Sequence, residues 1–394
     1  MKIVVYSHEF PPFLGGLATT SYKLVKGFCE SEFKVAALVP SYNKHQKEID
    51  DTVDCNIYRV PFLGNKIIRS VPFLQQLIGL AALGYLIFRE KPDVVLFITE
   101  EAESIGGILS VFIDFKSVVR VAGSGVTTCF FGNNFIKNLL KYPMMKLYRK
   151  SEKIIAVSNY AKSLLTNIGV PKDKIEVVFN GINEEFLNQK KDINKINELK
   201  KRLGIDDNDK VLITIARIVP RKGQDNVIKS LPKIMKAFPN IKYLVVGEGR
   251  YKEKFQELAS KLNLDNVVKF TGGIDNKKII NYLDMSDIFI MPNRVWNNKV
   301  EGLPNALIEA AARGLAVIAG NESGSVEAVV DGKTGFLIDP NNIDEISDAI
   351  IRLLTNSTLL DDFGKNGIEF IIKNFREDLM INNYVRVLKE AASS

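Results

Sequence analysis

The sequence predicts an α/β protein with two domains, each built on a parallel sheet covered by helices. The chain has 394 residues, a length typical of two domains. Strand-like runs such as KIVVYS are continuously apolar, which indicates strands with both faces covered. These runs alternate with helical segments, a pattern that gives right-handed crossovers and parallel sheets. Two such blocks therefore predict two Rossmann-like domains.

The first block carries six expected strands, which are residues 2–7, 33–40, 93–99, 117–123, 153–158 and 174–180. Between the second and third lies an uncharged stretch of 18 residues, 71–88, which is close to the minimum length of a spanning helix. Pro72, Gly79 and Gly84 interrupt it, so we interpret it as a helix packed on the sheet. A peripheral helix lying on a bilayer is the alternative, and basic residues flank the stretch: Lys66, Arg69, Arg89 and Lys91.

The second block also carries six expected strands, which are residues 210–216, 242–249, 267–273, 288–293, 315–320 and 336–339. A polar, lysine-rich stretch after NGINEEF marks the boundary. We predict a first domain over 1–185, on which an amphipathic helix at 376–394 packs back, and a second domain over 186–375. Two such sheets facing one another would form a cleft between their carboxyl ends, where open α/β sheets bind ligands.

Composition and charge narrow the classes of partner. Apolar residues make up 46% and charged residues 25%, as in proteins with ordinary cores. Of the net charge of +7, residues 1–170 contribute 20 Lys and Arg against 14 Asp and Glu. That excess indicates a membrane surface or a phosphorylated ligand, and the absence of basic–aromatic interleaving argues against nucleic acid. Scattered Cys29, Cys55 and Cys129 predict a reducing cytoplasm, with neither a disulfide framework nor a metal site.

The stretch EGLPNALIEAAARG, residues 301–314, predicts an anion site beside two carboxylates. Pro304 suits a first helical turn and Gly314 a helix end. The main-chain N–H groups around 302–306 and the helix dipole then favour an anion. Glu301 and Glu309 are eight residues apart, or about 12 Å along a helix. Their carboxylates are suited to accept hydrogen bonds from sugar hydroxyls on either side of a diphosphate.

Two cations follow an expected strand in ARIVPRKG, residues 216–223. Arg217 and Lys222 are five residues apart across a turn that contains a proline. A guanidinium fork and a point-charge ammonium together are suited to neutralise a departing diphosphate.

These motifs resemble those of retaining glycosyltransferases of the GT-B fold, in the large family 4 group. The matching segments are E-x7-E (Glu301, Glu309), R-x4-K (Arg217, Lys222), HEFPPFLGG at 8–16, VFNGIN at 178–183 and GSVEAVVDGKTGFLIDP at 324–340. The segments extend over nearly the whole chain. E-x7-E alone is a weak signal, and the combination is a specific one.

The resemblance implies roles for individual residues. Arg217 and Lys222 would bind the donor diphosphate, Glu301 the donor sugar and Glu309 the ribose. The main chain of the segment after Glu301 would assist donor binding, and a glycine loop would close near the phosphate, where close approach and a positive φ favour glycine. These donor-binding residues are Gly302, Leu303, Pro304, Asn305, Gly15 and Gly16. The family needs no metal ion, and the aspartates of GIDDNDK (204–210) lie in a polar connection where we expect them to be solvated.

One position departs from the family pattern. Ala122 stands where the family usually has a histidine that contacts the donor sugar. His8 and Ser124 are candidates for the acceptor or sugar side, although a histidine at a strand end is more often a local hydrogen-bonding residue. Two alternatives therefore stay open: a nucleotide-sugar-binding protein with lost or weak catalysis, and a GT-B-like sugar epimerase.

The sequence thus predicts a metal-independent retaining glycosyltransferase without a cofactor. Its donor is a UDP- or GDP-linked sugar, and its acceptor a hydroxyl of a glycolipid or cell-surface polysaccharide intermediate, selected by the first domain. We expect it in the cytoplasm, with peripheral contact at the inner membrane surface through that domain.

Overall fold

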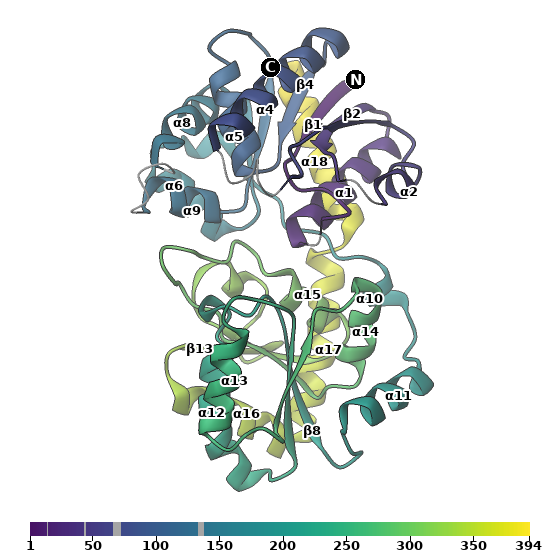
Figure 1. Cartoon of the computed structure of the whole chain (residues 1–394), viewed down its shortest axis with the longest axis vertical. Helices are drawn as coiled ribbons and strands as arrows, with labels where there is room; N and C mark the ends of the chain where they lie inside the picture. Colours follow the sequence, from purple (N-terminus) through teal and green to yellow (C-terminus); the bar gives the residue numbers. More distant parts are fainter. Residues whose placement is uncertain (14, 43–44, 66–71, 133–137) are drawn as a thin grey trace. The chain divides into compact units, whose positions relative to one another are not determined.

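A computed structural model describes residues 1–13, 15–42, 45–65, 72–132 and 138–394 (Figure 1). Lys66 and Arg69 of the predicted basic flank lie outside these residues. The chain divides into two compact units. The first comprises Met1–Gly181 and Glu377–Ser394, and the second comprises Ile182–Arg376.

The first unit contains a parallel seven-stranded sheet in the order β3-β2-β1-β4-β5-β6-β7. The strands are β1 Lys2–Tyr6, β2 Lys34–Pro40, β3 Asn56–Val60, β4 Val94–Phe97, β5 Ser117–Val121, β6 Lys153–Ala156 and β7 Ile175–Val177. Six were predicted, and β3 was missed. It is an edge strand that is only half-buried and carries Asn56 and Arg59, so it lacks the continuous apolar pattern.

Helices cover both faces of this sheet. On one face α1 (Gly16–Cys29) and α18 (Glu377–Ser393, yellow in Figure 1) form a core with β1, β2 and β4, in which Phe28 packs against Tyr384. On the other face lie α4 (Pro72–Glu90) and α5 (Glu100–Leu109). The remaining helices are α2 Gln46–Asp50, α6 Ser124–Phe130, α8 Lys141–Lys150, α9 Asn159–Asn167 and the 3-10 turn η1 Lys172–Lys174.

The uncharged stretch forms α4 and packs on the sheet as we interpreted it. Leu83 and Leu86 are buried, and Gly79 allows close packing on Tyr6 and Ile105, which a Cβ atom there would approach to 2.5 and 2.4 Å. Over the described part of the chain, none of the helices combines the length and the apolar character needed to cross a membrane.

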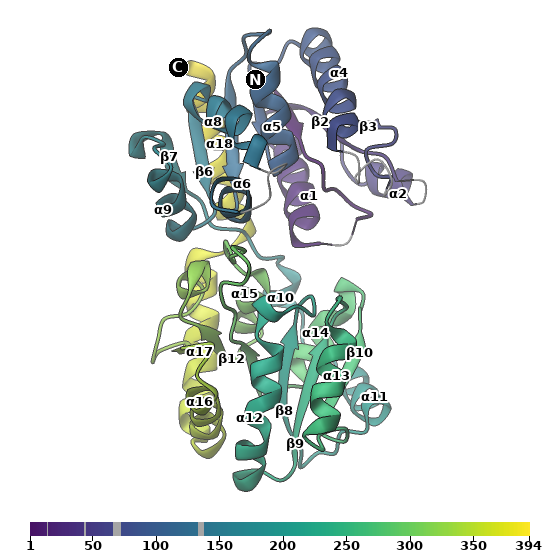
Figure 2. The same cartoon turned by 60° about the vertical axis from the view of Figure 1, so that its left-hand side comes forward.

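The second unit contains a parallel six-stranded sheet in the order β10-β9-β8-β11-β12-β13 (Figure 2). Its strands are β8 Lys210–Ile215, β9 Ile241–Val246, β10 Val268–Gly272, β11 Ile288–Met291, β12 Ala316–Gly320 and β13 Gly335–Ile338. Its helices are α10 Glu185–Asn188, α11 Ile193–Leu203, α12 Gln224–Ala237, α13 Lys252–Lys261, α14 Asn276–Asp284, α15 Asn305–Ala312, α16 Ile343–Thr355 and α17 Ser357–Asn374, with 3-10 turns η2 Pro220–Lys222 and η3 Ser323–Glu327. This confirms the predicted α/β class and parallel sheets.

In both sheets the strand order reverses direction once. The reversal lies between β1 and β4 in the first unit and between β8 and β11 in the second. Open α/β sheets bind ligands at the carboxyl ends of the strands on either side of such a reversal. In the second unit these are the segments that follow β8 and β11, which carry the R-x4-K and E-x7-E motifs.

The expectation of isolated cysteines was wrong. Cys29, the last residue of α1, forms a disulfide with Cys55, immediately before β3. Their Cα atoms lie 5.9 Å apart although 26 residues separate them in sequence, because pairing of β3 with β2 returns the chain to the end of α1. Cys129 is free and buried. The cysteines therefore do not support a reducing compartment, and the cytoplasmic localisation stays a prediction.

Candidate functional site

The segment after β8 turns tightly so that its cations reach the end of β11. Arg217 lies in the loop and is exposed, while Lys222 ends the turn η2 and is largely buried. Gly223 follows with a φ of 78°, and a Cβ atom there would lie 2.1 Å from the carbonyl oxygen of Pro292, just after β11. Only glycine fits this turn, and the fit brings the two segments together.

The carboxylate of Glu301 lies within this arrangement and is 8% exposed. Its Oε1 atom lies 2.9 Å from Nζ of Lys222 and also forms an ion pair with Nη1 of Arg221. Nη1 of Arg221 donates a hydrogen bond of 2.7 Å to the carbonyl oxygen of Val300, which ties the guanidinium to the chain beside Glu301. The structure thus joins two predicted residues, Lys222 and Glu301, through direct contact.

The charges in this cluster are unequal. Arg217, Arg221 and Lys222 carry three positive charges against the single carboxylate of Glu301, and the charge of Arg217 acts on both Glu301 and Lys222. Burial alone would raise the pKa of Glu301, but the charges of Lys222 and Arg221 hold it below its usual value. Burial, aided by Arg221, lowers the pKa of Lys222 against the opposing effect of Glu301. A surplus of two positive charges suits a dianion such as a diphosphate.

The segment after Glu301 leads directly into α15. Pro304 is the N-cap rather than a first-turn residue, so the helix begins at Asn305. Gly302 is half-buried, and Gly324 packs on its carbonyl oxygen so closely that a Cβ atom would lie 1.6 Å away. Leu303 is buried. Gly314 follows the helix with a φ of 77°, the predicted left-handed stop.

Glu309 lies on α15, five residues into the helix, and its side chain is half-buried. The role in ribose binding stays a prediction. Its position along α15 agrees with the expected separation of the two carboxylates.

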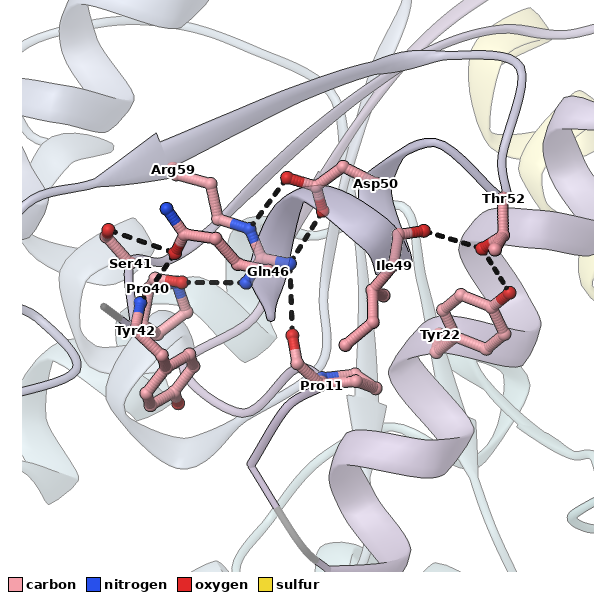
Figure 3. A network of polar contacts seen from close by, with 10 residues as sticks. All are labelled: Pro11, Tyr22, Pro40, Ser41, Tyr42, Gln46, Ile49, Asp50, Thr52 and Arg59. Atoms are coloured by element: carbon pink, nitrogen blue, oxygen red, sulfur yellow. Dashed lines mark hydrogen bonds and ion pairs between the residues drawn. The ribbon is translucent and has the colours of Figure 1, made fainter. Parts of the chain in front are cut away.

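The glycine loop of the first unit is exposed and anchored at its start (Figure 3). Arg59 donates hydrogen bonds of 3.0 Å to the carbonyl oxygens of Pro11 and Pro40 and pairs through two nitrogens with Asp50. Gly15 has a φ of 171°, so the expected positive φ is not found there, because extended backbone suffices. An added Cβ atom at Gly15 would meet nothing closer than 3.5 Å, so packing within this unit does not itself require glycine there.

His8 is buried at the end of β1 rather than exposed to a ligand. Nε2 lies 2.6 Å from Oη of Tyr6, and Nδ1 lies 2.9 Å from Nε2 of Gln75. The NH2 group of Gln75 can donate to Nδ1 and Nε2–H can then donate to Oη of Tyr6, so both ring nitrogens have partners within this unit. The local hydrogen-bonding interpretation of His8 fits this geometry better than a role in substrate contact.

Ala122 and Ser124 lie at the carboxyl end of β5. Ala122 is half-buried, and Oγ of Ser124 donates a hydrogen bond of 3.3 Å to Oε1 of Glu100, the first residue of α5. The side chain of Glu100 also packs on Gly125. The carboxylate of Glu100 therefore lies against Ser124 and Gly125, two and three residues after Ala122.

Sequence reasoning missed Arg221 and Glu100. The doublet Arg221-Lys222 offered a weak signal, because it adds a further cation beside Lys222 in the R-x4-K motif. Glu100 follows β4 at the strand-order reversal of the first unit, which becomes visible only once the order of strands is known.

No metal-binding cluster of three or more His, Cys, Asp or Glu side chains occurs among the described residues. Asp206 and Asp207 are exposed, as expected, in the turn before β8. That turn is at the amino end of the strand, and Arg217 follows its carboxyl end.

Two sequence families match this chain. Residues 14–186 match Glycosyltransferase Family 4, and residues 195–370 match Glycosyl transferases group 1. A GDP-mannose-dependent alpha-(1-6)-phosphatidylinositol monomannoside mannosyltransferase of Mycolicibacterium smegmatis is 31% identical over 235 residues, 59% of this chain. The chain spans only 61% of the length of that relative. An uncharacterised glycosyltransferase of Methanocaldococcus jannaschii is 26% identical over 99% of this chain and 98% of its own.

Solved structures share the fold across the whole chain. HepE of Anabaena in complex with UDP and glucose has a TM-score of 0.81 at 18% identity, covering 99% of both chains. Sucrose-phosphate synthase of Thermosynechococcus elongatus has a TM-score of 0.82 at 17% identity, covering 100% of both. Together with the two sequence families, these similarities show that the chain belongs to the GT4-like glycosyltransferases of the GT-B fold.

Proposed function

We propose that the chain transfers a sugar from a nucleoside diphosphate sugar to an acceptor hydroxyl with retention of anomeric configuration. The observation that carries the proposal is the buried cluster of Arg221, Lys222 and Glu301 at the strand-order reversal of the second unit. It combines surplus positive charge for a diphosphate with a carboxylate for sugar hydroxyls.

In the proposed reaction the diphosphate is the leaving group. The bond between the anomeric carbon and the phosphate oxygen breaks, and the bond to the acceptor oxygen forms on the same face of the sugar. The released phosphate oxygen takes the proton of the acceptor hydroxyl. Lys222 moves from Glu301 to the diphosphate, Arg217 joins it, and the start of α15 contributes its dipole. Arg221, tied to the main chain, stays with Glu301 and keeps it ionised and oriented toward the donor sugar.

We propose further that no metal ion takes part. Three cationic side chains and a helix start supply the charge that a metal would supply at a diphosphate. Transfer rates should be equal with and without EDTA. A loss of activity that Mg²⁺ or Mn²⁺ restores would contradict this part of the proposal.

The donor and acceptor classes are supported by the relatives. The mannosyltransferases similar to this chain are named for GDP-mannose and for a phosphatidylinositol mannoside. We propose a GDP- or UDP-linked sugar and a glycolipid or surface-polysaccharide intermediate, with GDP-mannose as the first donor to test. A thermal-shift panel of GDP, UDP and ADP sugars identifies the base through the stabilisation that binding adds.

The test of transfer uses single substitutions at the cluster. Glu301→Gln, Lys222→Ala and Arg217→Ala should each slow transfer by roughly 10²-fold or more, because each removes charge that acts on the donor in the transition state. Glu257→Gln, an equal charge change on the exposed side of α13, is the control. Unchanged rates in the three variants would contradict the proposal. Donor binding without transfer or hydrolysis would favour the binding-protein alternative, and an epimerised donor without acceptor would favour the epimerase.

We also propose that the first unit contacts a membrane through α4. Five outward side chains of this helix are apolar and recur at helical spacing, and the charged Arg89 follows them; the five are Leu74, Leu77, Ala81, Tyr85 and Phe88. Phe88 is 78% exposed and Tyr85 60%. Over 14 residues the stripe extends about 21 Å. An exposed apolar stripe of this length is unusual for a face covered by water.

Charge and neighbouring aromatic residues favour an anionic bilayer as the partner of this stripe. Val111 and Phe112 follow α5, which packs against α4, and Phe112 is 77% exposed. Arg89 and Lys91 lie at the end of the stripe, in the half of the chain that carries most of the net positive charge. Aromatic residues with flanking cations are typical of helices that lie in the interface. Such contact would hold the enzyme, on the inner membrane surface, beside a lipid-linked acceptor.

Vesicle sedimentation tests this contact. The chain should bind phosphatidylglycerol-containing vesicles, and Tyr85→Ser/Phe88→Ser should lose most of that binding, whereas Ile372→Ser on α17 should retain it. Equal binding of all three proteins, or a dimer that forms through the stripe in light scattering, would contradict membrane contact.

A further inference from the structure

We propose that a groove beside Trp296 in the second unit is a binding site for an acidic saccharide, separate from the transfer site. The groove has a volume of about 360 Å³ and lies where α12, α13 and the loop after β11 meet (Figure 2 shows α12 and α13). The residues that define its chemistry are Asp225, Lys229, Tyr251, Lys254, Lys261 and Trp296. None of them belongs to the cluster around Glu301.

A tight hairpin presents Trp296 to the groove. Trp296 and Lys299 exchange main-chain hydrogen bonds of 3.1 and 2.9 Å. The two residues between them, Asn297 and Asn298, have φ angles of 50° and 57°, as a two-residue hairpin turn requires. The ring is 38% exposed, so the hairpin holds a large aromatic surface partly open to solvent.

The side chain of Arg294 packs against this hairpin and holds it in place. Its guanidinium lies 5.4 Å from the centre of the Trp296 ring and donates a hydrogen bond of 2.7 Å to Asp225. Its main-chain nitrogen donates to the carbonyl oxygen of Arg221 at 2.9 Å. Because Arg294 is only 6% exposed, the aromatic wall of the groove rests on a buried ion pair.

The opposite wall is one face of α13. Tyr251, Lys254, Leu258 and Lys261 recur at spacings of three and four residues, which places them on the same side of the helix. Nζ of Lys254 lies 5.3 Å from the centre of the Tyr251 ring, and the side chains of Lys254 and Lys261 are exposed. This wall thus combines an aromatic ring, an apolar side chain and two cations.

The net charge of the groove selects an anionic ligand. Asp225 is the single acidic residue of its lining, and Arg294 neutralises it. Lys229 of α12 also pairs with Asp225, at 3.9 Å, so the exposed ammonium groups of Lys254 and Lys261 give the lining its surplus of positive charge. Lysine ammonium groups pair with a carboxylate or a phosphate as point charges.

Aromatic walls and volume favour a saccharide as the carrier of that anion. The C–H face of a pyranose ring packs on aromatic rings such as Trp296 and Tyr251, and its hydroxyls suit lysine donors. A volume of 360 Å³ is near the lower limit for ligand sites and suits one or two sugar rings. The choice of ligand rests on the proposed function, since a chain that transfers sugars encounters glycan acceptors and products. The groove would hold an acidic portion of such a glycan while another portion reacts.

The protein contains its own reporter for this site, because Trp296 is its only tryptophan. We expect a saturable change in tryptophan emission when digalacturonic acid is added to the full chain, with a dissociation constant of about 0.1–1 mM. The methyl ester of the same disaccharide should cause no saturable change, because it keeps the rings and loses the charge. Mannose 6-phosphate against mannose tests whether phosphate serves as well as carboxylate.

Substitution of the lysines tests whether the saccharide binds in this groove. Lys254→Ala/Lys261→Ala should weaken digalacturonic acid binding about tenfold, as expected for two exposed ion pairs of up to about 0.7 kcal/mol each. Lys277→Ala/Lys278→Ala, an equal charge change on the exposed part of α14, should leave it unchanged. Equal responses to the acid and its ester, equal weakening in both variants, or no saturable change with any of the four saccharides would overturn the proposal.

The titration contains no donor nucleotide, so its result is independent of transfer. A chain that shows the emission change but no sugar transfer would refute the proposed function and leave the groove in place. A chain that transfers sugar without the emission change would refute the groove alone.

Discussion

Glu301→Gln tests whether the carboxylate is needed to neutralise the two buried cations. In the wild type one oxygen of Glu301 contacts both Arg221 and Lys222, whose side chains are each 12% exposed. The glutamine keeps the shape and removes the charge, so both cations lose their counter-ion. Breaking a buried ion pair from one side costs about 3–5 kcal/mol, and partial exposure favours the lower end. For a unit of this size, 3 kcal/mol corresponds to a decrease in Tm of roughly 6–12 °C.

The assay is thermal unfolding followed by the emission of Trp296, which reports on the second unit because the chain has no other tryptophan. Pyrophosphate should restore stability to Glu301→Gln, because an anion then replaces the lost carboxylate; at about a hundred times its dissociation constant it adds about 2.7 kcal/mol. Glu257→Gln should melt within about 2 °C of the wild type. If Glu301→Gln unfolds at the same temperature as Glu257→Gln, the carboxylate does not neutralise the cations and the reasoning fails.

Three further changes test other parts of the account. Glu103→Gln removes a buried carboxyl group whose pKa is raised by burial to about 8. The free energy of unfolding of the wild type should fall as pH rises from 5 to 8, because this carboxyl ionises freely only in the unfolded state. Relative to the wild type, the variant should therefore gain about 1.4 kcal/mol per pH unit in denaturation followed by circular dichroism. Arg59→Met should release the loop that begins at Pro11 and lower the free energy of unfolding of the first unit by about 3 kcal/mol. Proteolysis within residues 11–16 should therefore accelerate, while the Trp296 transition stays unchanged. Gly223→Ala should destabilise the second unit by at least about 2 kcal/mol, since it adds a Cβ atom in a left-handed turn; the Trp296 transition measures this, and a wild-type Tm would contradict it.

The sequence was sufficient to predict the fold because most strands are buried on both faces. β1 and β8 are continuous apolar runs, and each leads into a turn rich in glycine or proline. The edge strand β3 has no such pattern, since Asn56 is exposed and the polar Arg59 is held in an ion pair with Asp50. The disulfide between Cys29 and Cys55 depends on strand pairing, which no spacing in the sequence reveals.

The sequence predicted the chemical types of the site residues better than the contacts between them. The two motifs indicated that Lys222 and Glu301 lie close together, because they follow strands that turn out to be neighbours. The sequence could not show which of the neighbouring cations contacts Glu301. Arg221 contacts it directly, and Arg217 influences it through its charge. His8 was a candidate for the sugar side from its position after β1, although a local hydrogen-bonding role was favoured; the sequence could not show that its partner is Gln75 of α4.

The most direct test of the central claim is a crystal structure of the chain with GDP or UDP bound. We predict phosphate oxygens within hydrogen-bond distance of Nζ of Lys222 and of main-chain N–H groups at 302–306, with the guanidinium of Arg217 turned toward them. In that structure Lys222 should have left Glu301, and Arg221 should still contact it. A nucleotide bound elsewhere, with Lys222 still paired to Glu301, would contradict the account.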